Sequence, residues 1–268
     1  MKTFKEKYGD WAVITGGTSG IGEAAAHFIA KAGINIVLVA RRKNVLESKA
    51  SDITSKHGVQ VKTIQADLSL SEDYKNVVSD TNDLQVGLFI PCAGIENHGI
   101  TTTIPLEREL ALIQLNVTST FILSQHFASK MVQRGKGGIL LVASLIGHMP
   151  NPYFSNYAGS KAYVVNFGTS LHWEMKKKGV DVTVLSPGVT DTPMSKSEDI
   201  DWSKAPFSIM SPEKTAQLGL NGLGKKPLVI PGRKNRIMMF MTTRLTPLKI
   251  AIKMGGKMTE KVMPSVLN

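Results

Sequence analysis

The sequence predicts an α/β fold, a single domain in which helices cover both faces of a doubly wound parallel sheet of about seven strands. Three observations predict it. Short apolar runs rich in β-branched residues alternate with longer segments of helical period, and these runs lack a polar face, as strands buried on both sides do. No internal repeat or linker interrupts the 268 residues, whose 42% hydrophobic content is enough for a sizeable core.

The expected strands and helices follow one another along the whole chain. Strands are expected at 11–15, 35–40, 59–65, 86–90, 138–143, 180–185 and 227–230. Helices are expected at about 20–32, 44–57, 72–82, 106–134 and 155–178. A further helix is expected after Ser211-Pro212-Glu213, where a serine N-cap precedes a proline at the first helical position. In such sheets ligands bind beyond the carboxyl ends of the strands, so functional residues are expected just after strands.

Cysteine and histidine usage limits the kinds of site that the chain can build. The single cysteine, Cys92, excludes an internal disulfide and a metal site built from cysteines, and it suits a reducing compartment. The six histidines have no spacing typical of a metal site, so core or surface roles are expected for them. The charged start lacks the apolar core of a secretion signal, and no run of about 18 apolar residues is present. We therefore expect a cytoplasmic protein without a resident metal.

The net charge of +11 is distributed unevenly. From Lys225 onward ten lysines and arginines face one acidic residue, Glu260, whereas the first 224 residues hold 22 basic and 20 acidic residues. A nucleic-acid interface would interleave its basic residues with aromatic ones, but Phe240 is the only aromatic residue of this basic segment. The charge therefore does not indicate nucleic acid as a partner.

The segment after the first expected strand, Thr15-Gly16-Gly17-Thr18-Ser19-Gly20-Ile21-Gly22, has the features of a dinucleotide-binding turn. Its glycines at 16, 20 and 22 allow a tight turn, close approach of the backbone to a pyrophosphate, and packing of the next helix on the sheet. That helix offers backbone amides and the positive end of its dipole. No Gly-Lys-Ser/Thr sequence follows, which argues against a mononucleotide P-loop. The turn predicts a Rossmann-type dinucleotide site.

The residues after the second expected strand indicate which dinucleotide is bound. An acidic residue at this point would hold the ribose hydroxyls of NAD, but the chain has Arg41, Arg42 and Lys43. A guanidinium binds phosphate through a planar fork of donors, which suits the additional 2′-phosphate of NADP(H). The alternative is that these basic residues are only the solvent-exposed start of the next helix. That is unfavourable, because positive charges would then lie at the positive end of the helix dipole. We therefore predict NADP(H) as the cofactor.

A tyrosine, a lysine and a serine form the candidate catalytic group. Tyr157 and Lys161 are four residues apart on an expected helix and so share one face, and Ser144 lies at the end of the preceding strand. A lysine beside a phenol favours the phenolate, so we expect Lys161 to lower the pKa of Tyr157 from its reference value of about 10. The pair would then exchange protons near neutral pH.

In these motifs the sequence resembles the short-chain dehydrogenase/reductase family, from about Asp10 to Ile230. The glycine turn is similar to the cofactor signature of that family, and Tyr157-Ala158-Gly159-Ser160-Lys161 is similar to its active-site motif. Asn116 matches a fourth catalytic residue beside Ser144, Tyr157 and Lys161. The resemblance implies cofactor contacts from Gly16, Thr18, Ser19, Gly20, Ile21, Gly22, Arg41, Arg42, Asp67, Leu68, Ala93, Gly94, Tyr157, Lys161, Pro187, Gly188, Val189 and Thr192.

The family mechanism assigns a role to each of the four catalytic positions. By resemblance, Tyr157 would protonate the carbonyl oxygen as a hydride leaves the nicotinamide, or deprotonate the alcohol in reverse. Ser144 would hydrogen-bond that oxygen, Lys161 would tune the phenol and hold the nicotinamide ribose, and Asn116 would anchor a water that relays protons to the lysine. The chain departs from the family where Pro91-Cys92 replaces two asparagines, which leaves the bracing of that turn open. We expect Cys92 to be a buried packing residue.

The resemblance implies an oxidoreductase that transfers a hydride between NADP(H) and a carbonyl or secondary alcohol. Residues 191–210 would form a lid over the substrate, and Trp202, Phe207, Ile209 and Met210 suggest an apolar molecule. His148 lies in a stretch that would line the substrate site. The alternative is a cofactor-binding sensor or structural protein that keeps the fold without turnover. The four intact catalytic positions favour the enzyme.

A basic amphipathic C-terminal extension, 233–268, follows the dinucleotide-binding and catalytic domain, 1–232. Apolar residues recur in 233–263 at helical spacing with basic residues between them, and Pro247 is expected to divide the segment into two short helices. The apolar stripe would pack on the body, cover the substrate entrance or join subunits of a homo-oligomer. Peripheral attachment to an anionic membrane is the other interpretation, since basic amphipathic helices bind at lipid interfaces.

Overall fold

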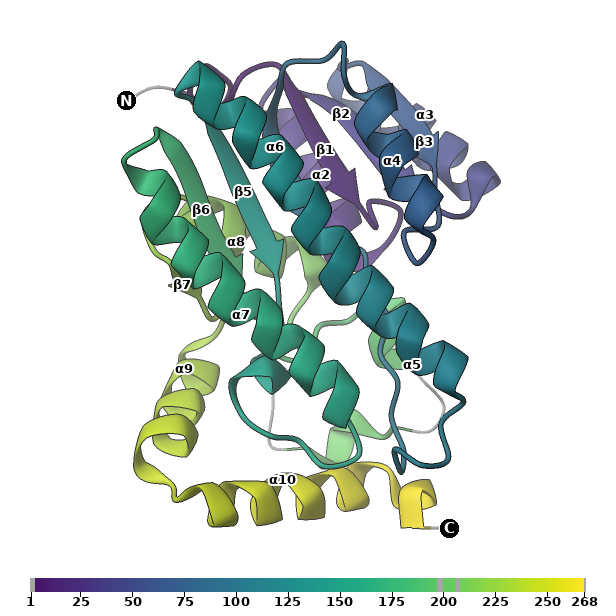
Figure 1. Ribbon diagram of the computed structural model, residues 1–268, viewed down its shortest axis with the longest axis vertical. Helices are drawn as coiled ribbons and strands as arrows, with labels where there is room; N and C mark the ends of the chain where they lie inside the picture. The colour runs from purple at the N-terminus through teal and green to yellow at the C-terminus, as the bar shows by residue number, and fades with distance from the viewer. Residues whose placement is uncertain (1–2, 197–199, 206–207, 268) are drawn as a thin grey trace.

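The computed structural model describes residues 3–196, 200–205 and 208–267, and its centre is a seven-stranded parallel sheet of order β3-β2-β1-β4-β5-β6-β7 (Figure 1). This confirms the predicted single-domain, doubly wound α/β fold. The strands are β1 (Trp11–Thr15), β2 (Asn35–Ala40), β3 (Val61–Gln65), β4 (Val86–Pro91), β5 (Gly137–Val142), β6 (Val180–Leu185) and β7 (Leu228–Val229). The strand order reverses between β1 and β4, which is where sheets of this kind bind their ligands.

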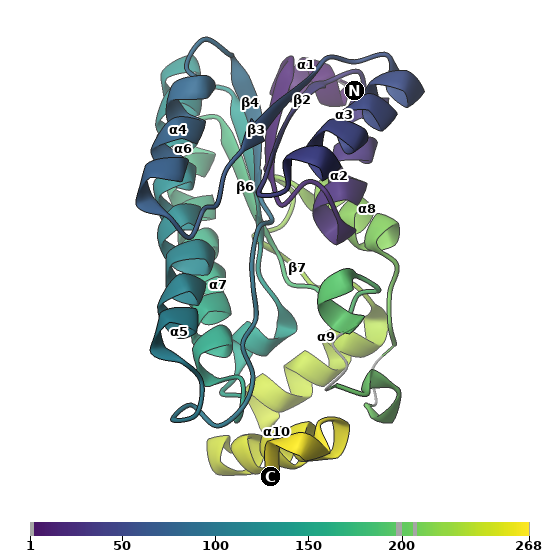
Figure 2. The same ribbon diagram turned by 90° about the vertical axis from the view of Figure 1, so that its right-hand side faces the viewer.

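Helices cover the two faces of the sheet, as Figure 2 shows with the sheet nearly edge-on. On one side lie α2 (Gly20–Lys31), α3 (Lys43–His57) and α8 (Pro212–Gly222), and on the other α4 (Ser71–Asp80), α6 (Thr120–Arg134) and α7 (Ser155–Lys176). The strands alternate their side chains between two apolar clusters, one containing Val13 and Phe89 and the other Ile14 and Leu88. Burial on both faces explains why these strands are apolar throughout. A short helix, α1 (Phe4–Tyr8), precedes β1.

The long helix expected at 106–134 is confirmed as one continuous helical stretch, within which the hydrogen bonding changes from α-helical to π-helical and back. It consists of α5 (Leu106–Ile113), a π-helical segment η1 (Gln114–Ser119) and α6. Asn116 lies in the π-helical segment, and such widened turns often occur at functional sites. The last strand is shorter than expected, because β7 pairs with β6 only at Leu228 and Val229.

The C-terminal segment forms helix α9 (Arg233–Phe240), a π-helical turn η5 (Met241–Leu245) and helix α10 (Leu248–Val262). Pro247 precedes α10 and separates the two helices, as expected. The helices lie at the end of the molecule toward which the strands point, and α10 crosses below the body (Figure 1). No helix in the described ranges is long and apolar enough to cross a membrane.

Candidate active site

A cavity of about 550 Å³ opens at the carboxyl ends of the strands and brings together residues from the whole length of the chain. Its floor is made by the glycine turn, the segments after β4 and β5, and α7, and its other walls by the loop after β6 and the helices α9 and α10. Six methionines contribute to a mainly apolar lining, namely Met149, Met194, Met238, Met239, Met254 and Met258. Methionine adapts its shape to a bulky apolar ligand, so the cavity suits such a molecule.

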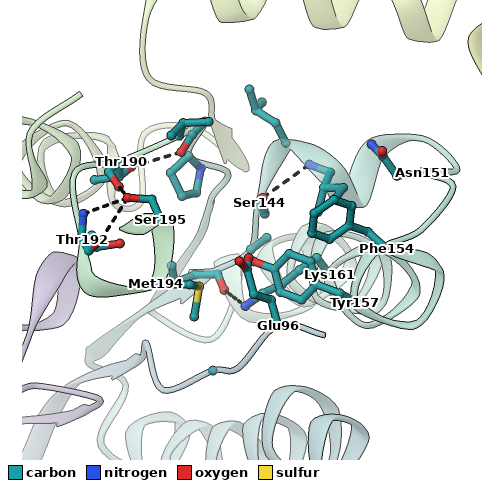
Figure 3. A pocket seen from close by; sticks show the side chains of 18 of the residues that line it. Glu96, Ser144, Asn151, Phe154, Tyr157, Lys161, Thr190, Thr192, Met194 and Ser195 are labelled. Carbon is teal, nitrogen blue, oxygen red and sulfur yellow. Dashed lines mark hydrogen bonds between the residues drawn. The ribbon is translucent and has the colours of Figure 1, made fainter. Parts of the chain in front are cut away.

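The candidate catalytic side chains lie together at one wall of this cavity. Tyr157 and Lys161 project from α7, and Ser144 follows β5 at the start of a 3-10 turn, η2 (Leu145–His148). Ser144 is hydrogen-bonded to the Tyr157 phenol, while the Lys161 ammonium donates to the Val142 carbonyl at 3.2 Å and lies 5.8 Å from the centre of the Tyr157 ring. Figure 3 shows the three side chains converging. In this arrangement the hydroxyls of Ser144 and Tyr157 can both hydrogen-bond the carbonyl oxygen of a ligand in the cavity.

The pKa of Tyr157 is shifted in the direction opposite to the one expected from the sequence. Burial raises the pKa of the phenol, the charge of Glu96 raises it further, and the hydrogen bond from Ser144 lowers it. Burial also lowers the pKa of Lys161. The expectation was wrong because burial of the phenol is the largest effect on its pKa and the nearby Glu96 carboxyl acts in the same direction, while the Lys161 ammonium lies beside the ring and donates to a backbone carbonyl.

Asn116 is fully buried and holds the chain segment that follows β4. Its side-chain amide donates to the Ile95 carbonyl at 2.8 Å and accepts from the Ile95 amide at 3.0 Å, and it also donates to the Ser160 hydroxyl at 3.2 Å. It does not line the cavity. Its side chain therefore couples α7 to the segment containing Gly94 and Glu96, rather than contacting a ligand.

The glycine turn has the shape that a dinucleotide phosphate requires. Gly16 has φ +65°, and a Cβ there would lie 2.8 Å from the Ala93 backbone, while Gly20 has φ +55° and a Cβ would lie 2.8 Å from the Thr192 side chain. Ser19 is the N-cap residue of α2, but its side chain makes no capping hydrogen bond. Backbone amides at the start of the helix are therefore available to an anion. These features of the turn fit a dinucleotide.

The other predicted cofactor residues surround this turn at different depths. Those that line the cavity with Gly16 and Gly20 are Ser19, Ile21, Ala93, Gly94, Tyr157, Lys161, Pro187, Gly188, Val189 and Thr192. Thr18 and Gly22 are buried within the turn, and a Cβ at Gly22 would overlap the Gly16 carbonyl. Leu68 packs in the core instead, so only its backbone could face an adenine.

Two arginines lie outside the cavity, beyond the carboxyl end of β2. Arg41 has a side chain that is 64% exposed, with its guanidinium 3.9 Å from the Asp67 carboxylate, and Arg42 is exposed at the N-cap position of α3. Asp67 also accepts hydrogen bonds from the Ser69 amide and hydroxyl. The arginines are therefore accessible to a phosphate on the adenosine side of a dinucleotide that extends from the glycine turn.

The turn at Pro91-Cys92 is braced without the two asparagines of the family pattern. The hydroxyl of Thr15 accepts hydrogen bonds from the backbone amides of Cys92 and Ala93, at 3.2 and 3.1 Å. Burial raises the pKa of the Cys92 thiol to about 11, so the thiol stays protonated and unreactive near neutral pH. This agrees with the packing role expected for Cys92.

The predicted lid contributes to the cavity only in part. Trp202 lines it, Ile209 is exposed, and Met210 lies outside the lining, while Phe207 falls outside the described residues. His148 also lies outside the lining, and its Nε2 is 3.0 Å from the Ser186 hydroxyl. The stretch 147–154 lines the cavity as expected, through Met149, Asn151 and Phe154, whereas His148 itself, Ile209 and Met210 do not.

The C-terminal helices supply walls of the cavity, which agrees with one of the roles left open for their apolar stripe, that of covering the substrate entrance. Gly255 and Gly256 of α10 lie against Pro152, the Tyr153 hydroxyl donates to Glu260 at 2.9 Å, and the Asp201 amide donates to the Val262 carbonyl at 2.8 Å. These contacts hold α10 against two loops that border the cavity. The glycine pair and Glu260, in a segment otherwise basic, were the available signals in the sequence.

Comparisons with known proteins agree with this geometry. A family model described as short chain dehydrogenase matches residues 10–202. The chain is 30% identical over 252 residues to a 7beta-hydroxysteroid dehydrogenase of Clostridium sardiniense, covering 94% of this chain and 97% of the relative. A structure solved for the stereoselectivity of 7beta-hydroxysteroid dehydrogenase superimposes with a TM-score of 0.88 at 27% identity, covering 95% and 99% of the two chains. A dehydrogenase from Sphingobium yanoikuyae in complex with NADPH superimposes with a TM-score of 0.79 at 30% identity, covering 88% and 93%.

Proposed function

The chain belongs to the short-chain dehydrogenase family and transfers a hydride between NADP(H) and a carbonyl or secondary alcohol, and we propose that its substrate is a ketone on a bulky apolar skeleton of steroid size. The observation that carries the proposal is the mainly apolar cavity of about 550 Å³ with Tyr157 and Ser144 in its wall. The relative from Clostridium sardiniense is named for a hydroxysteroid, which agrees with a molecule of this size and character.

Three residues act on the substrate or the cofactor in this proposal, and Asn116 positions the chain segment beside them. Ser144 donates a hydrogen bond to the substrate oxygen, and Tyr157 gives its proton to that oxygen as the carbonyl carbon receives a hydride. Lys161 holds the nicotinamide ribose, and Asn116 keeps the segment after β4 in place through its two bonds to Ile95. Bound NADPH supplies the hydride. The high pKa of Tyr157 keeps the phenol protonated, which suits the reductive direction.

Cofactor recognition divides between the glycine turn and the arginines. The amides at the start of α2 bind the pyrophosphate, and the backbone of Ala93 and Gly94 lines the cavity between the glycine turn and Lys161. Asp67 and the Leu68 backbone flank the adenine, while Arg41 and Arg42 bind the 2′-phosphate. Backbone groups of 187–189 and the hydroxyl of Thr192 contact the nicotinamide.

A comparison of ketones tests the substrate class. We expect purified protein with NADPH to reduce steroid ketones with a kcat/KM at least about tenfold above that for acetophenone or a ketose. A tenfold ratio corresponds to about 1.4 kcal/mol, which the burial of additional apolar surface in the transition state supplies. The reaction is followed by NADPH absorbance. A ketose reduced more efficiently than every steroid ketone would contradict the proposal.

The catalytic reading is favoured over a cofactor-binding sensor. A sensor needs the glycine turn and the arginines to bind the cofactor. It does not need Ser144 and Tyr157 hydrogen-bonded to each other at the wall of an apolar cavity. The named relative is itself a dehydrogenase. Turnover in the comparison of ketones separates the two functions.

We further propose that the outer surface of the C-terminal helices attaches a cytoplasmic protein to anionic membrane. On α9 and η5 the outward side chains of Ile237, Phe240, Met241 and Leu245 are 54%, 60%, 49% and 60% exposed. Exposed basic residues lie among them, at Arg233, Lys234, Arg236 and Arg244. The inner side of the same helices lines the cavity through Met238, Met239 and Thr242. An apolar substrate dissolved in lipid would thus reach the cavity from the attached side.

Co-sedimentation with vesicles tests this attachment. We expect the full chain to sediment with phosphatidylcholine vesicles that contain phosphatidylserine at low salt, and less at high salt, since each basic residue near the surface contributes about 1 kcal/mol. Replacing Ile237 and Phe240 by Gln should abolish sedimentation. The control Leu110→Gln removes a similarly exposed apolar side chain, 59% exposed, from α5 and should have no effect. Equal sedimentation of all three proteins, or of none, would contradict the proposal.

We also propose that the chain forms a homo-oligomer through α6 and α7. Exposed aromatic residues follow these two adjacent helices, with Phe121 43%, Tyr163 36% and Trp173 75% exposed. Phe121 and Tyr163 both contact Phe167, so the rings of Phe121, Tyr163 and Phe167 form one aromatic cluster across the two helices that suits a second copy. Light scattering should give a multiple of the 29.1 kDa chain mass, and a monomer mass at micromolar concentration would contradict the proposal.

A further inference from the structure

Glu96 is an ionisable side chain at the active site that none of the assigned roles uses. It follows β4 and lines the cavity beside Tyr157 and Lys161, as Figure 3 shows. It also lines a second, more polar cavity of about 640 Å³, which shares Gly94, Glu96 and Met194 with the first. Within the described ranges no hydrogen-bonding or ion-pair partner is found for its carboxyl group. The carboxyl group therefore faces the reacting centre directly.

Asn116 places Glu96 in this position. The two hydrogen bonds between Asn116 and the Ile95 backbone fix the residue immediately before Glu96. The buried amide thus holds the carboxyl group at the wall between the two cavities, close enough for its charge to act on both Tyr157 and Lys161. A residue in a mobile loop would not have a defined effect on either group.

The titratable groups around Glu96 act on it in known directions. Burial raises the pKa of the Glu96 carboxyl to about 7, and the Lys161 ammonium on α7 lowers it. Tyr157 on the same helix and the Cys92 thiol after β4 are neutral near pH 7, since burial raises the pKa of both. His98 and Arg108 border the second cavity. Above pH 7 Glu96 is therefore a carboxylate, and a negative charge beside a phenol opposes its ionisation.

We propose that Glu96 is a positioning residue for the proton of the reaction, whose carboxylate holds the Tyr157 phenol in its protonated form and thereby extends carbonyl reduction to alkaline pH. The inference rests on the proposed role of Tyr157 as the proton donor. In reduction a C–H bond forms at the carbonyl carbon, the phenol O–H bond breaks, and the proton moves to the carbonyl oxygen. The rate falls when the phenol has already lost that proton to solvent.

The pH profile of reduction tests the proposal. We measure kcat/KM for the best ketone with NADPH between pH 6 and 11 in the wild-type protein and in Glu96→Gln, which keeps the shape of the side chain and removes its charge. The pH at which kcat/KM falls on the alkaline side, the alkaline limb, should be lower in the variant than in the wild type by about one to three units. This is the range of pKa shift that a single close charge produces. The rate of the variant in the plateau at low pH should stay within about threefold of the wild type, since the phenol is protonated in both proteins.

Two further variants serve as controls. Glu96→Asp restores the charge and should move the limb back toward the wild-type position. Glu107→Gln removes an exposed carboxylate of α5 outside both cavities and should leave the profile unchanged. An alkaline limb that coincides in Glu96→Gln and the wild type would overturn the proposal, as would an equal shift in Glu107→Gln.

A measurement without turnover separates this proposal from the proposed function. The folded-state pKa of Glu96 lies above its unfolded value of about 4.3, so its contribution to stability is lost as the pH rises from about 4 through 7. The Tm of Glu96→Gln relative to the wild type should therefore increase over this range and level off above it. A constant difference in Tm would show that Glu96 is not a buried, titrating carboxyl, whatever the substrate of the enzyme is.

Discussion

Replacing Tyr157 by Phe is expected to lower the rate of ketone reduction by about 10² to 10⁴ while leaving NADPH binding nearly unchanged. The substitution removes the hydroxyl that is hydrogen-bonded to Ser144 at the cavity wall. It keeps the buried ring beside the Lys161 ammonium. The proton donor is lost, whereas the glycine turn and the arginines are untouched. Steady-state kcat with a steroid ketone and NADPH titration by fluorescence measure the two properties separately.

A second tyrosine of α7 provides the matched control. Tyr163 lies on the same helix and is 36% exposed, away from the cavity lining, so Tyr163→Phe should retain wild-type kcat. A Tyr157→Phe protein that reduced the ketone at the wild-type rate would show that another group donates the proton. Loss of NADPH binding in that variant would show that the ring is needed to keep the site folded.

The substitution Arg41→Ala should weaken NADPH binding by about 10- to 100-fold and barely change NADH binding. Charge-assisted hydrogen bonds to a phosphate are worth about 1.5–3 kcal/mol, which corresponds to this range of affinity. Only NADPH carries the 2′-phosphate that the exposed guanidinium would bind. The dissociation constants of the two cofactors, measured by fluorescence titration, give the ratio directly.

Lys43 offers a basic control two residues away from Arg41. Its ammonium lies 3.9 Å from Glu47 on the next turn of α3 and is well exposed, so Lys43→Ala should affect NADPH binding less than about threefold. Equal weakening of NADPH and NADH by Arg41→Ala would mean that the arginine supports the fold of the site instead of recognising the 2′-phosphate. An unchanged NADPH affinity would place the phosphate elsewhere.

The strands and the glycine turn could be predicted because their signals are local. An apolar run between turn residues is sufficient to indicate a buried strand, and six of the seven predicted runs agree with the observed strands to within one residue at each end. The turn at Gly16 and Gly20 combines a fixed spacing with backbone conformations that glycine adopts freely, at φ +65° and +55°. Tyr157 and Lys161 share a helix face by spacing alone.

The parts that could not be predicted depend on contacts between distant segments. The π-helical turn at Asn116 forms where the asparagine bonds Ile95, 21 residues earlier, and periodicity does not record that pairing. Glu96 affects Tyr157 only because the sheet brings the end of β4 beside α7. The two C-terminal helices were expected, but the choice between packing on the body, covering the substrate entrance and joining subunits could not be made, since Met238 and Met254 face the cavity only after α9 and α10 fold over it.

Transfer of deuterium from the nicotinamide to the product tests the central claim of hydride transfer most directly. We incubate the protein with NADPH carrying deuterium at the transferred position of the nicotinamide ring and a steroid ketone in ordinary water, and analyse the alcohol by mass spectrometry. The account predicts one deuterium on the new carbinol carbon and none of it on the hydroxyl, because that proton comes from Tyr157 and exchanges with solvent. An alcohol without deuterium, after transfer from both faces of the ring has been tested, would contradict it.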